Sequence, residues 1–244
     1  MDEKSLTIAF ENSLTDKSMY CLSNLAEVGL DSIMEDGLFK DVPILSTIVS
    51  LYKIGSNIKD RHNIKKLISF LNEINSEMPN QEEREKYKKK FQKSKHFRDM
   101  ELEYILVIID RYIGYEKTLY LAHLYLAYLD EKIDWNSFAE YSEIIDRLFP
   151  SDFNCLFSFM CHGGIIVKEE KNINIASVLR LVSVGLVEQQ TGMTWIDLDN
   201  PKKNKEDFDY YITDFGNTFV KIFEKELREE HARKAALITG DTQQ

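Results

Sequence analysis

The stretch IASVLRLVSVGLV, residues 175–187, decides the fold of the C-terminal third of the chain. Its apolar residues recur at intervals of three and four, which predicts an apolar helix from Ile175 to Gly185. Gly185 suits the left-handed position that ends such a helix, so we expect the chain to enter a strand at Leu186 and Val187.

The residues that follow predict a hairpin and a closing helix. Alternation from Met193 to Leu198 predicts a short strand around Trp195, and the polar residues 200–205 (NPKKNK) predict the tip of the hairpin. A returning strand is expected from Phe208 to Ile212. Thr213 and Asp214 then start a helix whose buried stripe we expect to consist of Phe215, Phe219, Ile222 and Phe223.

Helix, strand, tip, strand and helix in this order are typical of a winged helix, a module that serves binding more often than catalysis. The stretch ITDFGNTF, residues 212–219, also resembles the closing strand and helix of many bacterial winged-helix proteins. We therefore expect a small α+β winged-helix domain at residues 150–230, followed by a flexible tail at 231–244.

Helices are expected to dominate the first 150 residues. The whole chain has only 4 prolines, and apolar residues recur there at helical spacing over long stretches. The expected segments are Ser18 to Met34, a helix capped by Asp41 with Pro43 in its first turn, a surface helix within 79–98, Met100 to Ile113, Leu119 to Asp130, and a helix capped by Asp134.

Part of this helical region resembles a known repeat. Asp110-Arg111, residues 122–130 (AHLYLAYLD) and Ile133-Asp134-Trp135 are similar to the TerB-like, tellurite-resistance-type helical repeat. Residues 42–149 also resemble a group of uncharacterised bacterial proteins. Their shared elements are an Ile-Pro-type apolar helix, an Arg-Asp-Arg-like element (here Lys59-Asp60-Arg61), a Phe-Leu helix (Phe70-Leu71) and the turn from Tyr128 to Asp134.

The resemblance implies a fold more than a function, because it brings no activity to a particular residue. It gives a mainly α protein in which a TerB-like helical bundle precedes the winged helix. The expected parts are an N-terminal helical segment at 1–40 and a helical domain at 41–149. The frequent setting of such proteins in mobile-element or phage-defence loci implies a similar context here.

Composition favours a cytoplasmic protein. The 244 residues are 43% hydrophobic and 30% charged, which is enough to bury one large core or two modest ones. The first 14 residues, MDEKSLTIAFENSL, are acidic where a secretory signal would be basic and then apolar. The three cysteines form no framework of close pairs, which fits a reducing compartment.

The net charge of −10 is unevenly distributed. Residues 53–98 hold 13 basic and 6 acidic residues, a net charge of +7, whereas residues 99–149 hold 4 basic and 11 acidic residues, a net charge of −7. Residues 150–244 hold 11 basic and 15 acidic residues, a net charge of −4. The basic block can bind an anion, or it can pack against its own acidic neighbours.

A nucleic-acid-binding regulator is therefore an alternative. In that case the helix at 175–185 would enter the major groove, and the tip would reach phosphates. The domain is acidic, however, and this helix has a single cation, which favours protein binding. The residues that the alternative requires are Arg84, Lys88, Lys89, Lys90, Lys93, Arg180, Lys202, Lys203 and Lys205.

A peripheral membrane effector is a second alternative. Residues 42–52 (VPILSTIVSLY) are apolar and run into a basic segment, as in an interfacial anchor, but they are too short to span a bilayer. A buried core helix explains the same pattern. The residues that would contact the membrane or a partner are Ile44, Leu45, Ile48 and Val49.

Catalytic and metal sites find little support in the sequence. The turn from Asp130 to Asp134 lacks the central glycine and ligand spacing of a calcium loop. Cys155, Cys161 and His162 lack the spacing of a zinc site, so we expect both thiols in a core. His123, on an apolar helical face, is expected to be a hydrogen-bonded packing residue. No cofactor, metal or catalytic residue is predicted.

Together these patterns predict a non-enzymatic interaction or regulatory protein that acts through its winged helix. A protein is the expected partner, with nucleic acid or a membrane surface as the alternatives, and a homodimer is plausible.

Overall fold

The computed structural model describes residues 58–77, 82, 85–87, 89, 95–162, 165–166, 174–191 and 208–229. These residues are mostly helical and include a small antiparallel sheet. The chain divides into two compact units, Met1–Asp146 and Arg147–Gln244. No helix in the described ranges is both long and apolar enough to cross a lipid bilayer.

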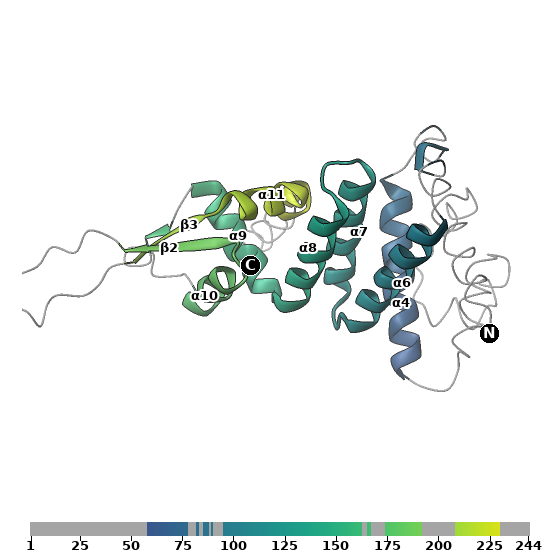
Figure 1. Ribbon diagram of the computed structural model, residues 1–244. Coiled ribbons are helices and arrows are strands. Elements are labelled where there is room, and N and C mark those ends of the chain that lie inside the picture. Colours follow the sequence, from purple (N-terminus) through teal and green to yellow (C-terminus); the bar gives the residue numbers. More distant parts are fainter. Residues whose placement is uncertain are drawn as a thin grey trace, which may run out of the picture. The chain divides into compact units, whose positions relative to one another are not determined.

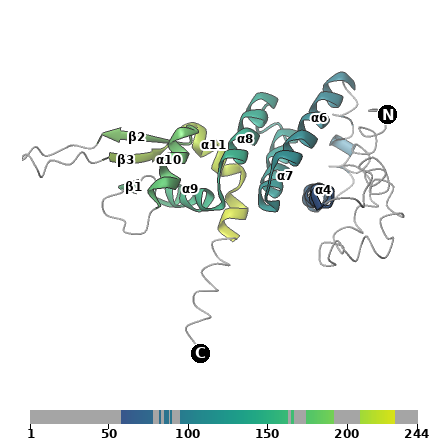
Figure 2. The ribbon, with the colours of Figure 1, turned by 90° about the horizontal axis from the view of Figure 1, so that it is seen from below.

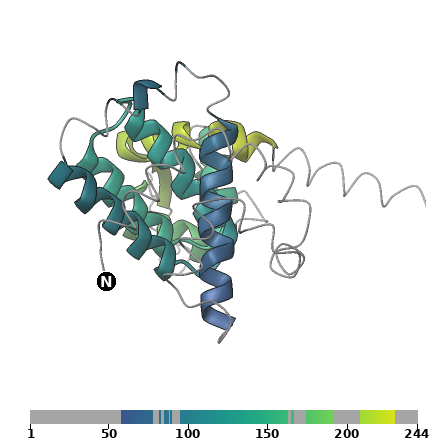
Figure 3. The ribbon, with the colours of Figure 1, turned by 90° about the vertical axis from the view of Figure 1, so that its right-hand side faces the viewer.

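The described part of the first unit is a helical bundle, whose helices lie side by side in Figure 1. Its described helices include α4 (Ile58–Ser76), α6 (Lys95–Arg111), α7 (Tyr115–Leu129) and α8 (Trp135–Arg147). The helix α4 packs most extensively against α7, and Figure 3 shows α4 lying across the other helices of the bundle.

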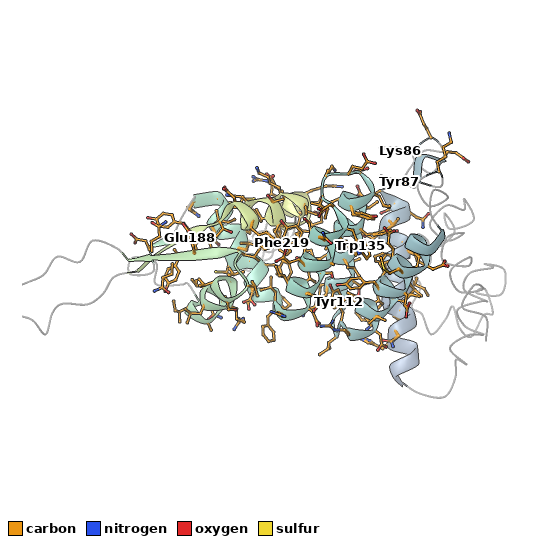
Figure 4. All side chains as sticks on the ribbon, in the orientation of Figure 1. Lys86, Tyr87, Tyr112, Trp135, Glu188 and Phe219 are labelled. Atoms are coloured by element: carbon orange, nitrogen blue, oxygen red, sulfur yellow. The ribbon has the colours of Figure 1, made fainter. Side chains whose placement is uncertain are left out.

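Aromatic rings fill the core between α6, α7 and α8. The Trp135 and Phe138 rings stack with centroids 4.9 Å apart, and Tyr104 meets Trp135 edge-on at 5.5 Å. Tyr125 meets Phe138 at 5.7 Å. Figure 4 shows Trp135 among the side chains of the bundle. Such rings bury large apolar areas, so this cluster supplies much of the unit's hydrophobic stabilisation.

The C-terminal end of α6 is capped by side chains from α4. Lys66 is buried with 1% of its surface exposed, and its ammonium group donates hydrogen bonds to the carbonyls of Ile109, Asp110 and Tyr112. His62 adds a contact of 2.7 Å between its Nε2 and the Ile113 carbonyl. The last carbonyls of a helix have no partner within the helix, so this positive group satisfies them and also complements the helix dipole.

Replacing the buried lysine tests this cap. Lys66→Met leaves the three carbonyls without their donor, and we expect the first unit to lose about 3 kcal/mol of unfolding free energy. Urea unfolding followed by Trp135 fluorescence, in a Trp195→Phe background, measures the loss. The neighbouring half-exposed Lys65 provides the control, because Lys65→Met is expected to change stability by less than about 0.5 kcal/mol. Equal effects of the two substitutions would contradict the capping role.

The described part of the second unit combines helices with the sheet. The helices include α9 (Pro150–His162), α10 (Ile175–Ser183) and α11 (Asp214–Ile222). The strands β1 (Ile165–Ile166), β2 (Val187–Thr191) and β3 (Phe208–Ile212) form an antiparallel sheet in the order β1-β3-β2. Figures 1 and 2 show β2 and β3 running alongside each other, with Gln189 opposite Tyr210 in the register.

The turn between α10 and β2 is fixed from both sides. Gly185 has a φ of +77°, and the amide of Leu186 donates to the carbonyl of Leu181 at 3.0 Å, which closes a Schellman-type turn. The Thr213 hydroxyl donates to the Gly185 carbonyl at 2.8 Å and accepts from the amide of Gly216 at 2.9 Å. The start of α11 is thereby held against the end of α10.

Gly216 is required by this close approach. A Cβ atom at position 216 would lie 2.0 Å from the Leu186 carbonyl oxygen, whereas a Cβ at position 185 would meet nothing within 4 Å. We expect Gly216→Ala to destabilise the second unit by more than about 3 kcal/mol. Gly185→Ala should cost only the left-handed backbone penalty of about 1 to 2 kcal/mol. Native-state hydrogen exchange of β3 amides measures both, and a smaller cost for Gly216→Ala would contradict the packing.

Several expectations from the sequence are confirmed. Helices occupy the segments predicted from Met100 and Leu119, Asp134 caps α8 by accepting from the Ser137 amide at 2.8 Å, and the strand at Phe208–Ile212 leads into a helix capped by Thr213. The helix at Ile175 ends at Ser183, two residues before Gly185.

Other expectations lie outside the described residues. These are the helix at 18–34, the helix capped by Asp41, the strand at 193–198, the tip at 200–205 and the tail at 231–244. Of the surface helix within 79–98, the structure describes only scattered helical residues and the start of α6. The units divide between Asp146 and Arg147, three residues before the boundary expected at 149/150.

Candidate interaction surface

A buried ion pair joins α9 to α10. The Asp152 side chain is fully buried, and Arg180 grips it in bidentate geometry, with Nε 2.8 Å from Oδ2 and Nη2 2.6 Å from Oδ1. Asp152 also accepts a hydrogen bond of 2.8 Å from the amide of Phe149. The other side of the guanidinium lies over the Phe149 ring, 4.9 Å from its centroid. These contacts commit Arg180 to the structure of its own unit.

The protonation of Asp152 depends on Arg180. Burial raises the pKa of the Asp152 carboxyl, but hydrogen bonds from Arg180, the Phe149 amide and Ser177 outweigh burial and hold the pKa below its ordinary value. A carboxyl whose pKa is lowered by folding stabilises the fold above its unfolded-state pKa of about 3.9. That contribution is lost as the pH falls through the lower pKa of the folded state.

Removing Arg180 should therefore lower the thermal stability of the chain by an amount that depends on pH. Arg180→Met leaves a buried carboxylate without its cation, and we expect the midpoint of thermal unfolding to fall by several degrees at pH 7. The difference from the unsubstituted chain should shrink near pH 3, where Asp152 of the variant is protonated. Arg228→Met, which breaks an exposed pair with Glu224, is the control and should have little effect at either pH. A loss independent of pH would contradict the assignment.

The outward side of α10 is apolar. Ile175 is 44% exposed and Leu179, one turn further on, is 50% exposed. Ala176 and Ser183 are also exposed on this side, whereas Val178 and Leu181 are buried on the opposite side. Phe149, which is 57% exposed, lies beside Arg180 at its margin. We name this surface the α10 face: Phe149, Ile175, Ala176, Leu179 and Ser183.

The α10 face adds to what the sequence pattern predicted for this helix. The apolar periodicity predicted a helix, but it did not distinguish buried positions from exposed ones. A nine-residue helix that carries apolar residues on both of its sides can bury only one side within a small domain. The remaining apolar side chains can contact a partner, and they offer a nucleic-acid phosphate no charge.

Few of the residues required for nucleic-acid binding lie in the described part of the chain. Lys89 is exposed, and Arg180 is held by Asp152. The other residues of that set, and the whole set proposed for membrane contact, lie outside the described residues: Arg84, Lys88, Lys90, Lys93, Lys202, Lys203, Lys205, Ile44, Leu45, Ile48 and Val49.

The basic segment also makes an internal contact. Tyr87 is buried with 6% exposed, and its hydroxyl donates to Asp130 Oδ1 at 2.5 Å. Burial raises the pKa of Asp130, but hydrogen bonds from Tyr87 and Lys132 lower it below its ordinary value overall. Figure 4 labels Tyr87 beside Lys86, whose charge also lowers the pKa of Asp130. A buried Tyr87 cannot serve as a stacking platform for a base.

The structure also places His123 and the two cysteines of α9. His123 is 9% exposed, and its Nε2 lies 3.0 Å from Glu73 Oε1, so the expected hydrogen-bonded packing role is confirmed. The expectation that both thiols lie in a core was wrong, because Cys161 is exposed and Cys155 is half-buried. The buried side of α9 is formed instead by Phe153, Leu156, Phe157 and Phe159.

Comparisons with protein-family models, curated proteins and solved structures find no match to this chain.

The sequence alone did not single out Asp152 or Phe149. A signal was present, because Asp152 is the only Asp, Glu, Lys or Arg in α9. The other residues of that helix are apolar or uncharged polar, apart from His162 at its end. A charged residue within an apolar helix predicts a buried partner, which here is Arg180.

Proposed function

We propose that the chain is a non-enzymatic interaction or regulatory protein that binds another protein through a winged-helix module in its second unit. The observation that carries this proposal is the α10 face, where apolar side chains are exposed while the one cation of the helix is held by a buried carboxylate. Exposed apolar side chains grouped on one surface are typical of protein-binding sites.

The topology supports the winged-helix assignment. The sheet order β1-β3-β2 and the position of α10 directly before β2 are compatible with a winged helix, and α11 follows β3 directly. In DNA-binding members the helix before the hairpin enters the major groove and presents polar and basic side chains. Here the equivalent helix, α10, presents Ile175 and Leu179.

Several polar side chains of the first unit hold its helices together. In the described first unit, Lys66 and His62 cap α6, while Arg111 pairs with Glu143 and Asp146 at 2.7 Å each. These contacts hold helices together and leave the named groups committed to structure. The resemblance of this unit to TerB-like repeats, the setting in a mobile-element or defence locus and the cytoplasmic location remain predictions.

A single charge on the α10 face tests the proposal. Leu179→Asp places a carboxylate where an apolar contact is required, and we expect it to abolish retention of a protein partner when the tagged full-length chain is purified from its own host. Thr218→Asp, at an exposed position on α11, is the matched control and should retain the partner. Circular dichroism checks that both variants fold.

The nature of the retained molecule decides the outcome. A protein held by the unsubstituted chain and by Thr218→Asp, lost from Leu179→Asp and insensitive to nuclease supports the proposal. Retention of nucleic acid in place of a protein, or equal retention of a protein by both variants, would contradict it.

A further inference from the structure

The helix α4 is buried on a side that faces away from α6 and α7. Its contacts with those two helices come from one side, where Lys66 binds the last carbonyls of α6 and the Phe70 ring lies 6.1 Å from the Tyr125 ring. Ile68 is two residues from both Lys66 and Phe70, so it lies about 160° around the helix from each of them. Ile68 is nevertheless only 6% exposed.

The burial extends along the helix. Leu71 and Asn75 follow Ile68 at helical spacing and are 0% and 6% exposed, and we name these three residues the outer stripe of α4. Figure 3 shows α4, in blue, in front of the other described helices of the bundle. A helix in such a place exposes its outward side, as α6 does at Met100 (43% exposed) and Val107 (52% exposed). The outer stripe therefore has a cover that α6 and α7 do not supply.

The apolar segment at residues 42–52, which lies outside the described ranges, is the part of the chain best suited to be that cover. It ends at Tyr52, and five residues, KIGSN, separate it from the start of α4 at Ile58. Connections of about two to eight residues join neighbouring antiparallel helices, so a helix at 42–52 would run back along α4. Residues 78–94, which follow α4, offer few apolar side chains and many charges.

We propose that residues 42–52 fold back along α4 and bury its outer stripe. Ile44 and Lys66 are equally far from Gly55, the middle of the link. Antiparallel pairing therefore brings Ile44 level with this part of α4 and near Ile68. The residues before the segment then continue the cover along the rest of the stripe. The apolar side that the segment places against α4 consists of Ile44, Leu45, Ile48 and Val49.

This contact lies in the first unit, so it is independent of the protein-binding role proposed for the second. It gives the apolar side of residues 42–52 an internal partner. The same four side chains would have to be exposed in a membrane anchor, so the two roles exclude each other.

Thiol labelling at position 68 of the full-length chain tests the proposal. A thiol introduced by Ile68→Cys should react slowly beneath the cover, and peptide mass spectrometry reads the reaction at this position alone. Leu45→Asp places a charge in the proposed contact, so we expect it to raise the labelling rate at position 68 at least about tenfold. Ser50→Asp, on the polar side of the same segment, is the matched control and should leave the rate unchanged.

A reference position separates loss of the cover from loss of the fold. Ile145, in α8, is 0% exposed, so a thiol introduced by Ile145→Cys reacts only when the bundle opens. Leu45→Asp and the milder Leu45→Ala should each raise labelling at position 68 more than at position 145. Equal rises at both positions in both variants, or no rise at position 68, would overturn the proposal.

Other occupants of the outer stripe give different results. If a second copy were the cover, labelling at position 68 would become faster as the protein is diluted, which would overturn the proposal. Vesicles of phosphatidylcholine and phosphatidylserine test the membrane surface. Vesicle binding by the unsubstituted chain that is lost in Leu45→Asp, with equal labelling at position 68 in both chains, would assign the segment to a membrane and overturn the proposal.

Discussion

The ion pair between Asp152 and Arg180 is the contact on which the account of this protein depends. A fully buried carboxylate is costly unless it is paired and hydrogen-bonded, and Asp152 receives both Arg180 and the amide of Phe149. The pair fixes α10 against α9 and neutralises the one cation of α10. One interaction thus supports the fold of the second unit and pairs the one cation of α10, beside the exposed side chains of Ile175 and Leu179.

The first unit follows the same principle, because its buried Lys66 and Tyr87 side chains both find hydrogen-bond acceptors at the ends of helices. Lys66 belongs to the basic block 53–98, yet it is buried and binds three carbonyls of α6. Tyr87, in the same block, is bound to Asp130. One basic residue of the block is therefore committed to main-chain carbonyls of its own unit, whereas packing of the block against its acidic neighbours stays a prediction.

The sequence predicted the helices and strands better than it predicted their contacts. Periodicity located α6, α7, β3 and α11, and the preference of Gly185 for positive φ identified the turn after α10. Periodicity could not reveal that Ile175 and Leu179 are exposed, since that depends on how much surface a small domain can bury. Nor could it pair Asp152 with Arg180, which are 28 residues apart.

The salt dependence of partner retention tests the central claim most directly. We expect the partner of the full-length chain to stay bound as salt is raised from about 50 to 500 mM, because contacts between apolar side chains are not weakened by screening. For binding to phosphates, the logarithm of the binding constant would instead fall steeply and linearly with the logarithm of the salt concentration. The reason is that such binding releases cations from the nucleic acid, and this release is less favourable at high salt. A steep, nuclease-sensitive loss would contradict the assignment of the α10 face as a protein-binding surface.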